Sequence, residues 1–214
     1  MSKRVQTFII FFFAICLMFF TGFFTTLFVE AIEVEEGIEL EEEKEEIVEK
    51  KVNYISSENI FDASVNGFNE ANIHQLGSNN TARIEQVGLG NWANIHQIAY
   101  DNEADIVQFG DKNRAAINQK EFLFFSGDND ATIIQNGDNN WGRIDQWGSG
   151  NEASLNQQYD NNIGYIFQMG FDRTSSISQN GGNNKAGLIN LNENTSVDIV
   201  QNGNNQNIEI LIGE

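Results

Sequence analysis

The stretch NWANIHQIAYDNEADIVQFGDKN, residues 91–113, contains one pattern twice. Asparagine, alanine, isoleucine and glutamine occupy every second position from Asn91 to Gln97, and the same order returns from Asn102 to Gln108. Side chains two positions apart lie on one face of a β-strand, whereas a helix would distribute them around its circumference. The stretch therefore predicts two short strands, each with one face of alanine, isoleucine and glutamine.

The pattern continues as an eleven-residue unit, N-x-A-x-I-x-Q-x-G-x-x, and thirteen such units cover residues 69–214. A five-residue insertion falls within residues 120–128. The fifth position is Ile or Leu in every unit, and the seventh is Gln in all except two, which have Asn190 and Ile212. Motifs such as GSNN and GDNN separate the units, and they favour tight turns because Gly, Asn and Asp tolerate positive φ.

The predicted fold is an all-β solenoid of stacked strand-arch-strand coils, with a cross-β, amyloid-like arrangement. Two units form one coil, and successive coils stack about 4.8 Å apart. Like residues then stack on like residues, which predicts two inward ladders. The inward amide ladder comprises Gln75, Gln86, Gln97, Gln108, Gln119, Gln135, Gln146, Gln157, Gln168, Gln179 and Gln201. The inward aliphatic ladder comprises Ile73, Ile84, Ile95, Ile106, Ile117, Ile133, Ile144, Leu155, Ile166, Ile177, Leu188, Ile199 and Ile210.

Alternate units differ at their outward positions, which supports a period of 22 rather than 11. The eighth position is Asn or Gln in four units of one set, and apolar in three units of the other. An apolar surface of this kind is typical of an interaction site. The predicted lateral apolar stripe comprises Trp147, Phe167, Met169, Ile189, Leu191 and Leu211.

Residues 1–31 are predicted to be a secretory signal peptide. Lys3 and Arg4 precede a long uncharged run that ends at Val29, within the small-x-small sequence Val29-Glu-Ala31. An uncleaved anchor is the alternative, since the run is long enough to span a bilayer, and it is the one expected route to membrane contact. The single cysteine, Cys16, lies in this run, so the mature chain would be secreted without disulfides.

Residues 32–68 are predicted to form an acidic, largely disordered segment. Residues 32–58 contain eleven glutamates against three lysines, a charge density that cannot bury a core. The formal charge of the whole chain is −19 and no basic patch is concentrated anywhere in the mature chain. This charge argues against a nucleic-acid partner, whose phosphates require a basic surface.

The remaining polar and aromatic residues indicate no catalytic site, cofactor or metal. His74 and His96 occupy the same position of the repeat two units apart and would stack on one outward face. Two imidazoles without a carboxylate or thiolate make a poor metal site, so we expect a solvated pair. Trp92, Trp141 and Trp147 occupy outward positions, where they would either pack laterally or stack on the sugars of a polysaccharide.

The repeat Asn-x-Ala-x-Ile-x-Gln-x-Gly, with its Gly-x-x-Asn turns, resembles the curlin repeat of curli amyloid subunits across residues 69–214. The resemblance implies secretion from a Gram-negative cell and assembly into extracellular fibres on its surface. It also implies three partners, which are further copies of the chain, other curli-type subunits and an outer-membrane secretion pore. The family contains a major subunit and a minor nucleator, and both roles remain open for this sequence.

We therefore expect a structural subunit of secreted functional amyloid fibres that serve biofilm matrix, adhesion and surface colonisation. The unit at residues 206–214 is apolar at alternating positions, and an uncapped strand edge recruits another chain. The alternative is a monomeric extracellular β-solenoid that acts as an adhesin or carbohydrate-binding module. A third hypothesis is a regulator of assembly, in which residues 32–58 hold copies apart by charge repulsion.

Overall fold

A computed structural model describes residues 51–54, 60–65, 68–121 and 127–213, which lie in one compact unit, Glu46–Glu214. The predicted signal peptide and most of the acidic segment lie outside the described residues. Within the described part the chain forms fifteen strands. They are β1 (Lys51–Tyr54), β2 (Ile60–Val65), β3 (Glu70–Leu76), β4 (Thr81–Val87), β5 (Trp92–Ile98), β6 (Glu103–Phe109), β7 (Arg114–Lys120), β8 (Asp130–Asn136), β9 (Trp141–Ser149), β10 (Glu152–Gln158), β11 (Ile163–Phe171), β12 (Thr174–Asn180), β13 (Lys185–Asn190), β14 (Ser196–Asn202) and β15 (Asn207–Ile212).

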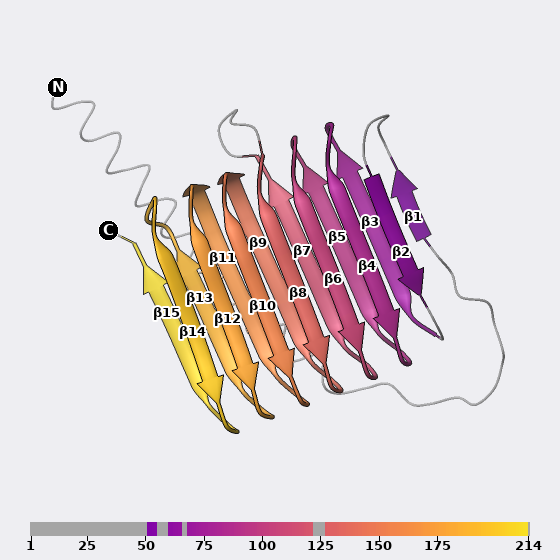
Figure 1. The fold of residues 1–214 in the computed structure, drawn as a ribbon, viewed down its shortest axis with the longest axis vertical. Coiled ribbons are helices and arrows are strands. Elements are labelled where there is room, and N and C mark those ends of the chain that lie inside the picture. The colour runs from indigo at the N-terminus through magenta and orange to yellow at the C-terminus, as the bar shows by residue number, and fades with distance from the viewer. Residues whose placement is uncertain (1–50, 55–59, 66–67, 122–126, 214) are drawn as a thin grey trace, which may run out of the picture. The chain divides into compact units, whose positions relative to one another are not determined.

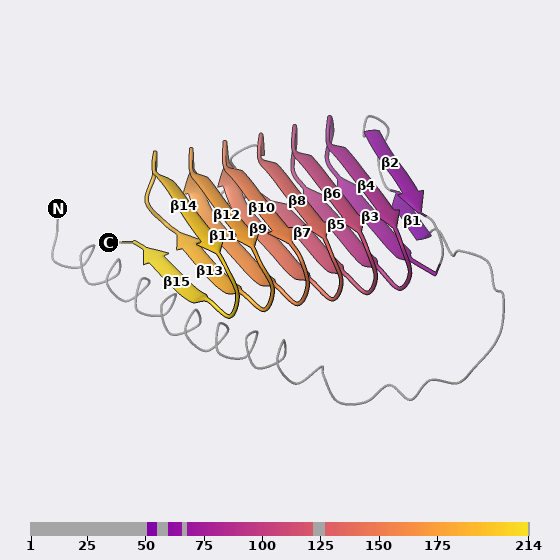
Figure 2. The same cartoon turned by 60° about the horizontal axis from the view of Figure 1, so that its bottom comes forward.

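The strands divide by parity into two parallel sheets. Sheet A contains the eight odd-numbered strands in the order β1 to β15, and sheet B contains the seven even-numbered strands from β2 to β14. In Figure 1 the odd strands point toward the top of the view and the even strands toward the bottom, and Figure 2 shows the two layers. Each coil is therefore one strand of each sheet, which confirms the predicted solenoid with two units per coil.

The register places identical repeat positions opposite one another. Ile73 pairs with Ile95 and Gln75 with Gln97, an offset of two repeat units. Across the insertion the offset grows by the inserted residues, since Glu103 pairs with Asp130. The insertion therefore falls between β7 and β8 and displaces no strand from register.

The core is narrow because each strand contributes only its third, fifth and seventh positions. Side chains alternate between buried and more exposed along β5, as expected for a strand with one inward face. Ala93 and Ile95 are fully buried, and so is Gln97. The small third position lets the two sheets approach, while the aliphatic fifth position supplies most of the apolar burial.

Most turns use left-handed backbone at two fixed positions. The residue before the first position of a unit has positive φ, for example 56° at Asn139 and 60° at Asn161. The ninth position also has positive φ in most units, and it is usually glycine. A Cβ atom added to Gly88 would lie 2.0 Å from the carbonyl oxygen of Gly110 in the next coil. Glycine is required there because the backbones of stacked turns nearly touch.

The solenoid begins one coil before residue 69, the start assigned from the repeat. Strands β1 and β2 lie within the predicted acidic segment and pair in parallel with β3 and β4. In this coil the repeat is degenerate, because Ala63 pairs with Ile84 and Val65 with Gln86. Parallel pairing is a backbone property, so a strand can join the sheet without the residues that define the repeat.

Candidate assembly site

The glutamines at the seventh position form two hydrogen-bonded columns, one in each sheet. The side-chain nitrogen of each glutamine except the last in its column donates to the side-chain oxygen of the glutamine one coil further on. In sheet B the Nε2 to Oε1 distance is 2.8 Å from Gln86 to Gln108 and 2.8 Å from Gln179 to Gln201. In sheet A it is 2.8 Å from Gln75 to Gln97. Buried amides need such partners, and stacking identical residues provides them at every coil.

The same nitrogen also links the two sheets across the core. Gln97 Nε2 of sheet A donates to the carbonyl oxygen of Thr81 in sheet B at 3.0 Å. Gln108 Nε2 of sheet B donates to the carbonyl oxygen of Trp92 in sheet A at 3.1 Å. Glutamines inside a column, such as Gln97 and Gln108, therefore bond to the next coil and to the opposite sheet through the same side-chain nitrogen.

The asparagines at the first position form a second ladder at the turns. The Asn91 backbone N–H donates to Asn69 Oδ1 at 2.8 Å, and the Asn113 backbone N–H donates to Asn91 Oδ1 at 2.8 Å. Asn91 Nδ2 in turn donates to the carbonyl oxygen of Gly110 at 2.7 Å. Sequence reasoning counted this asparagine but gave it no role, although its presence in ten of thirteen units was the available signal.

The amide columns have a direction and two different ends. In sheet B the donors point from Gln86 toward Gln201, so the first member retains an acceptor and the last retains a donor. Gln86 Oε1 is buried without a hydrogen-bond partner, and Val65 stands beside Gln86 in the register. Among the described residues no strand pairs with the outer edge of β14 or of β15.

In sheet A the amide column stops earlier. The last glutamine is Gln168, and the next two coils place Asn190 and Ile212 at the seventh position. Gln168 Nε2 donates to Ser175 Oγ at 3.0 Å. Asn190 accepts a 2.8 Å hydrogen bond from Thr195 Oγ1. A local hydroxyl and amide network thus replaces the ladder in the C-terminal coils.

The aliphatic residues of the fifth position form one continuous cluster. The fifth-position side chains from Ile84 to Leu188 are at most 1 % exposed, and the side chain of Ile199 is 2 % exposed. Ile210, in the edge strand β15, packs against the cluster and is only partly buried. Its outward neighbour Leu211 is 69 % exposed. The edge coil therefore presents apolar side chains that the interior coils bury.

The residues of the predicted lateral stripe all lie on sheet A, on strands β9 to β15 and the turn after β13, but their exposures differ. Phe167 is 4 % exposed and Ile189 is 8 % exposed, whereas Leu211 is largely exposed. The rings of Trp147 and Phe167 make an edge contact with centroids 5.4 Å apart. The six side chains thus follow one side of the sheet without forming a uniformly exposed surface.

The outward faces of the two sheets carry different charges. Strands β3 to β15 of sheet A carry four basic residues, Arg114, Lys120, Arg143 and Lys185, and three acidic ones, Glu70, Asp145 and Glu209. Strands β4 to β14 of sheet B carry one basic residue, Arg83, and six acidic ones, Glu85, Glu103, Asp105, Asp130, Glu152 and Asp198. The acidity of the described strands is therefore concentrated on one face.

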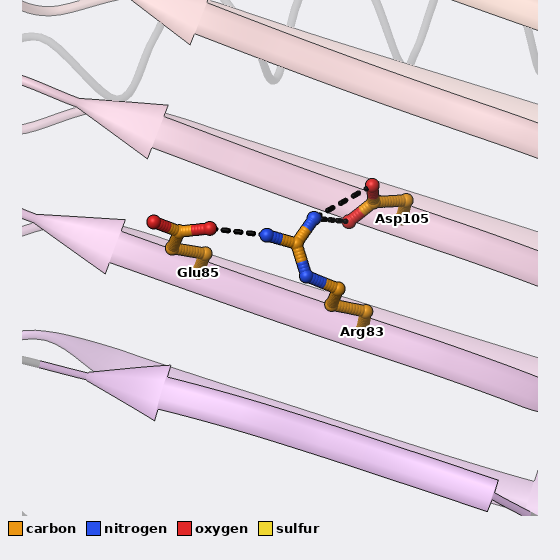
Figure 3. A network of polar contacts seen from close by, with 3 residues as sticks. All are labelled: Arg83, Glu85 and Asp105. Atoms are coloured by element: carbon orange, nitrogen blue, oxygen red, sulfur yellow. Dashed lines mark hydrogen bonds and ion pairs between the residues drawn. The ribbon is translucent and has the colours of Figure 1, made fainter.

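Arg83 is the centre of an ion-pair network on the acidic face (Figure 3). Its Nη1 atom lies 3.0 Å from a carboxylate oxygen of Asp105 on the next strand, and its Nη2 pairs with Glu85 on its own strand. Burial raises the pKa of the Asp105 carboxyl, and the adjacent Arg83 opposes that shift. Burial, together with the carboxylates of Glu103 and Glu152, also raises the pKa of Asp130.

The two histidines stack on the outward face of sheet A as the repeat predicts. The ring centroids of His74 and His96 lie 4.8 Å apart, with an interplanar angle of 51°. Burial lowers the pKa of His96, and the charges of His74 and Lys120 lower it further. Within residues 68–121 and 127–213, no group of three or more His, Cys, Asp or Glu side chains could hold a metal ion.

Comparison with known proteins identifies the repeat in the first part of this solenoid. Residues 69–98, 100–121 and 128–158 match the model of the Curlin associated repeat. The chain carries three matches to the curlin repeat. The curlin repeat family is structural rather than catalytic, and its members are extracellular fibre subunits. Comparison with curated proteins and with solved structures gave no match.

The curlin repeat match ends at residue 158, but the coils continue to β15 in the same register. The C-terminal units depart from the repeat at its polar positions, with Arg173 and Thr195 in place of the first asparagine. Arg173 is 3 % exposed and donates to the carbonyl oxygens of Phe171 and Leu191.

The described residues contain no helix long and apolar enough to cross a membrane.

Proposed function

We propose that this curlin-repeat protein is a structural subunit of secreted curli-type amyloid fibres, which grow by end-to-end stacking of solenoid coils. The observation that supports this best is the open edge at β14 and β15, where the two sheets end on strands with no neighbour on one side among the described residues. A second copy can continue the parallel sheets there with the same spacing of about 4.8 Å, because the edge strands still have backbone N–H and C=O groups available for parallel pairing.

Assembly also has an energetic reason. Each coil buries its amides and aliphatic side chains against two neighbours, whereas an end coil has only one. Ile208, Ile210 and Ile212 occupy the inward positions of β15 and are only half-buried. Stacking another coil on this edge would remove their remaining apolar surface from water, which stabilises the joined state.

The proposed setting follows from the family. The fibres would lie on the surface of a Gram-negative cell and serve biofilm matrix, adhesion and surface colonisation. The chain would leave the cell through an outer-membrane pore after removal of residues 1–31, and it would meet other curli-type subunits at the surface. The role as major subunit or as nucleator is open, and seeding the major subunit of the same cell with this chain distinguishes the two.

Self-assembly is tested on purified residues 32–214 in neutral buffer at several concentrations. We expect thioflavin fluorescence to rise with a concentration-dependent lag, fibres to diffract at the cross-β spacing of about 4.7–4.8 Å, and these fibres to seed fresh protein. A soluble β-rich monomer at every concentration would contradict the proposal. That outcome would favour the monomeric adhesin or carbohydrate-binding module instead.

Two substitutions on one strand separate end-to-end stacking from lateral contact. Ile210→Lys places a charge on the inward face of the edge strand, where the next coil would have to bury it. We expect seeded elongation to slow at least tenfold. Leu211→Lys changes the neighbouring outward side chain, and elongation should continue at nearly the original rate. Equal rates for the two variants would contradict growth at this edge.

A further inference from the structure

Sheet A has a groove on its outward face that the assembly of coils does not use. Its volume is about 460 Å³, which is within the range of small-molecule and oligomer sites. The groove lies over β3, β5, β7 and β9, away from the edge strands β14 and β15. Its lining includes Phe68, Glu70, Trp92, Arg114, Ala116 and Trp141.

The register explains why these side chains meet. Trp92 pairs with Arg114, and Arg114 pairs with Trp141, so the second position reads tryptophan, arginine, tryptophan across three adjacent strands. Two positions further along β7, the outward residue is Ala116, whose register partners are Asn94 and Arg143. The small alanine between two larger side chains leaves the hollow beside the indole rings.

Arg114 is the basic group of the groove and is exposed. No ion pair or hydrogen bond of its side chain is formed within the described part of the chain, whereas Arg143 on the next strand lies 2.9 Å from Asp145. A guanidinium prefers a planar, two-oxygen acid as its partner. What distinguishes this groove is an arginine without a carboxylate partner that lies between two tryptophans in the register.

We propose that the groove binds an extended polysaccharide that carries carboxylate groups, in other words a uronic-acid polymer. The two tryptophans are two strand spacings apart, about 9.6 Å. Alternate rings of an extended β-1,4-linked glycan present the same face at a comparable spacing, so both indoles can stack on one strand of sugar. The carboxylate of the ring between them then lies beside Arg114.

Glu70 and the negative net charge of the chain weaken the binding of an anionic polymer but do not prevent it. Glu70 lies on β3, two strands from Arg114, and its carboxylate accepts a 2.8 Å hydrogen bond from Asn72. Repulsion from more distant acids is screened beyond about 8 Å at physiological ionic strength. Binding should therefore weaken at very low salt, where the acidic face of sheet B repels the polymer, and also at high salt, where the Arg114 contact is screened.

The proposal is tested with two hexamers that differ only at C6, β-1,4-linked mannuronic acid and β-1,4-linked mannose. Binding to the purified full chain is followed by tryptophan fluorescence and calorimetry. We expect the mannuronate hexamer to bind at least tenfold more tightly than the mannose hexamer. Equal affinities would overturn the assignment of Arg114 to a carboxylate, and binding of neither hexamer would overturn the site.

Matched variants locate the site. Trp92→Ala and Arg114→Gln should each weaken mannuronate binding about tenfold, from the loss of one stacking or one charge-assisted contact. Trp147→Ala and Lys185→Gln, which lie outside the groove lining, should leave it unchanged. Circular dichroism verifies that each variant keeps its β content.

The groove proposal and the fibre proposal can fail independently. Hexamer binding tests the groove, whereas thioflavin kinetics of the same variants report fibre assembly alone. If Arg114→Gln alters lateral bundling of fibres while the hexamers do not bind, the occupant is a second copy of the chain and the polysaccharide assignment is overturned.

Discussion

The two sheets of the solenoid share one repeat, yet only one of them keeps its glutamine column to the last strand. In sheet B the column runs without interruption from Gln86 to Gln201, whereas in sheet A it ends at Gln168. The sheets also differ outside, since acidic side chains gather on sheet B and the histidine pair and tryptophan groove lie on sheet A. The repeat therefore determines which residues face the interior of a coil. Where the glutamine column ends, and which outward side chains lie together, depends on the neighbouring coils.

The glutamine column of sheet B should be the more sensitive to interruption at its centre. Gln135→Leu removes the bonds to Gln108 and Gln157 and the link to the carbonyl oxygen of Arg114, which leaves buried polar groups without partners. We expect a loss of about 3–5 kcal/mol in the free energy of unfolding, measured by urea denaturation. The exposed neighbour provides the control, since Asn136→Leu should change stability by less than about 1 kcal/mol. Similar values for both variants would contradict a stabilising ladder.

The terminal network of sheet A should tolerate change better. Asn190→Ala removes the acceptor of Thr195 Oγ1 and a contact with Ser175 Oγ, while the backbone ladder of β13 remains. We expect a loss of about 1–2 kcal/mol in the same assay. Asn192→Ala in the adjacent turn is the control and should be nearly neutral. A loss as large as that of Gln135→Leu would mean that the two columns are equivalent after all.

Acidification should destabilise sheet A through its histidine pair. The pKa of His96 is lowered in the folded state, so the unfolded chain binds a proton first as the pH falls below about 6.5. Stability contributed by neutral His96 is therefore present above that pH and is lost as the pH decreases. The effect is measured as the difference between the free energies of unfolding above and below that pH. The variant His96→Asn should have a smaller difference, and it places at this position the residue found at Asn118 in the next coil. An unchanged difference in the variant would locate the pH dependence elsewhere.

Asp130 in sheet B should make stability depend on pH in the opposite direction, and this effect should be the smallest of those predicted. The pKa of Asp130 is raised in the folded state, so the folded chain holds a proton that the unfolded chain has already released just above pH 3.8. Stability is therefore lost as the pH rises through that range. Asp130→Asn should slightly stabilise the fold at neutral pH, where like charges from Glu103 and Glu152 act on the carboxylate. Ser154→Asn, an uncharged change on the neighbouring strand, should have no pH-dependent effect.

Sequence reasoning predicted the interior well because the interior is periodic. Alternate residues share a face, and residues one coil apart stack, so the positions of Ile106 and Gln108 followed from counting alone. The partners of their hydrogen bonds did not follow. The link from Gln108 to the carbonyl oxygen of Trp92 depends on the distance between the sheets, which the repeat does not state.

Departures from the repeat were harder to predict. The strands Lys51–Tyr54 and Ile60–Val65 lack the motif and join the sheets through backbone pairing. Phe167 and Ile189 alternate as outward residues but are buried in the structure, and Leu211 in the same row is exposed. Burial of an outward side chain depends on what surrounds it, and periodicity carries no information about that.

The sequence by itself determined the strand length, the turn positions, the inward residues and the coil of two units, because these depend on local geometry and on a period. Tertiary structure alone decided the direction of the amide columns, the early end of the column in sheet A and the meeting of Trp92, Arg114 and Trp141 in one groove. These features need the close approach of strands that belong to different coils, and only folding brings those strands together.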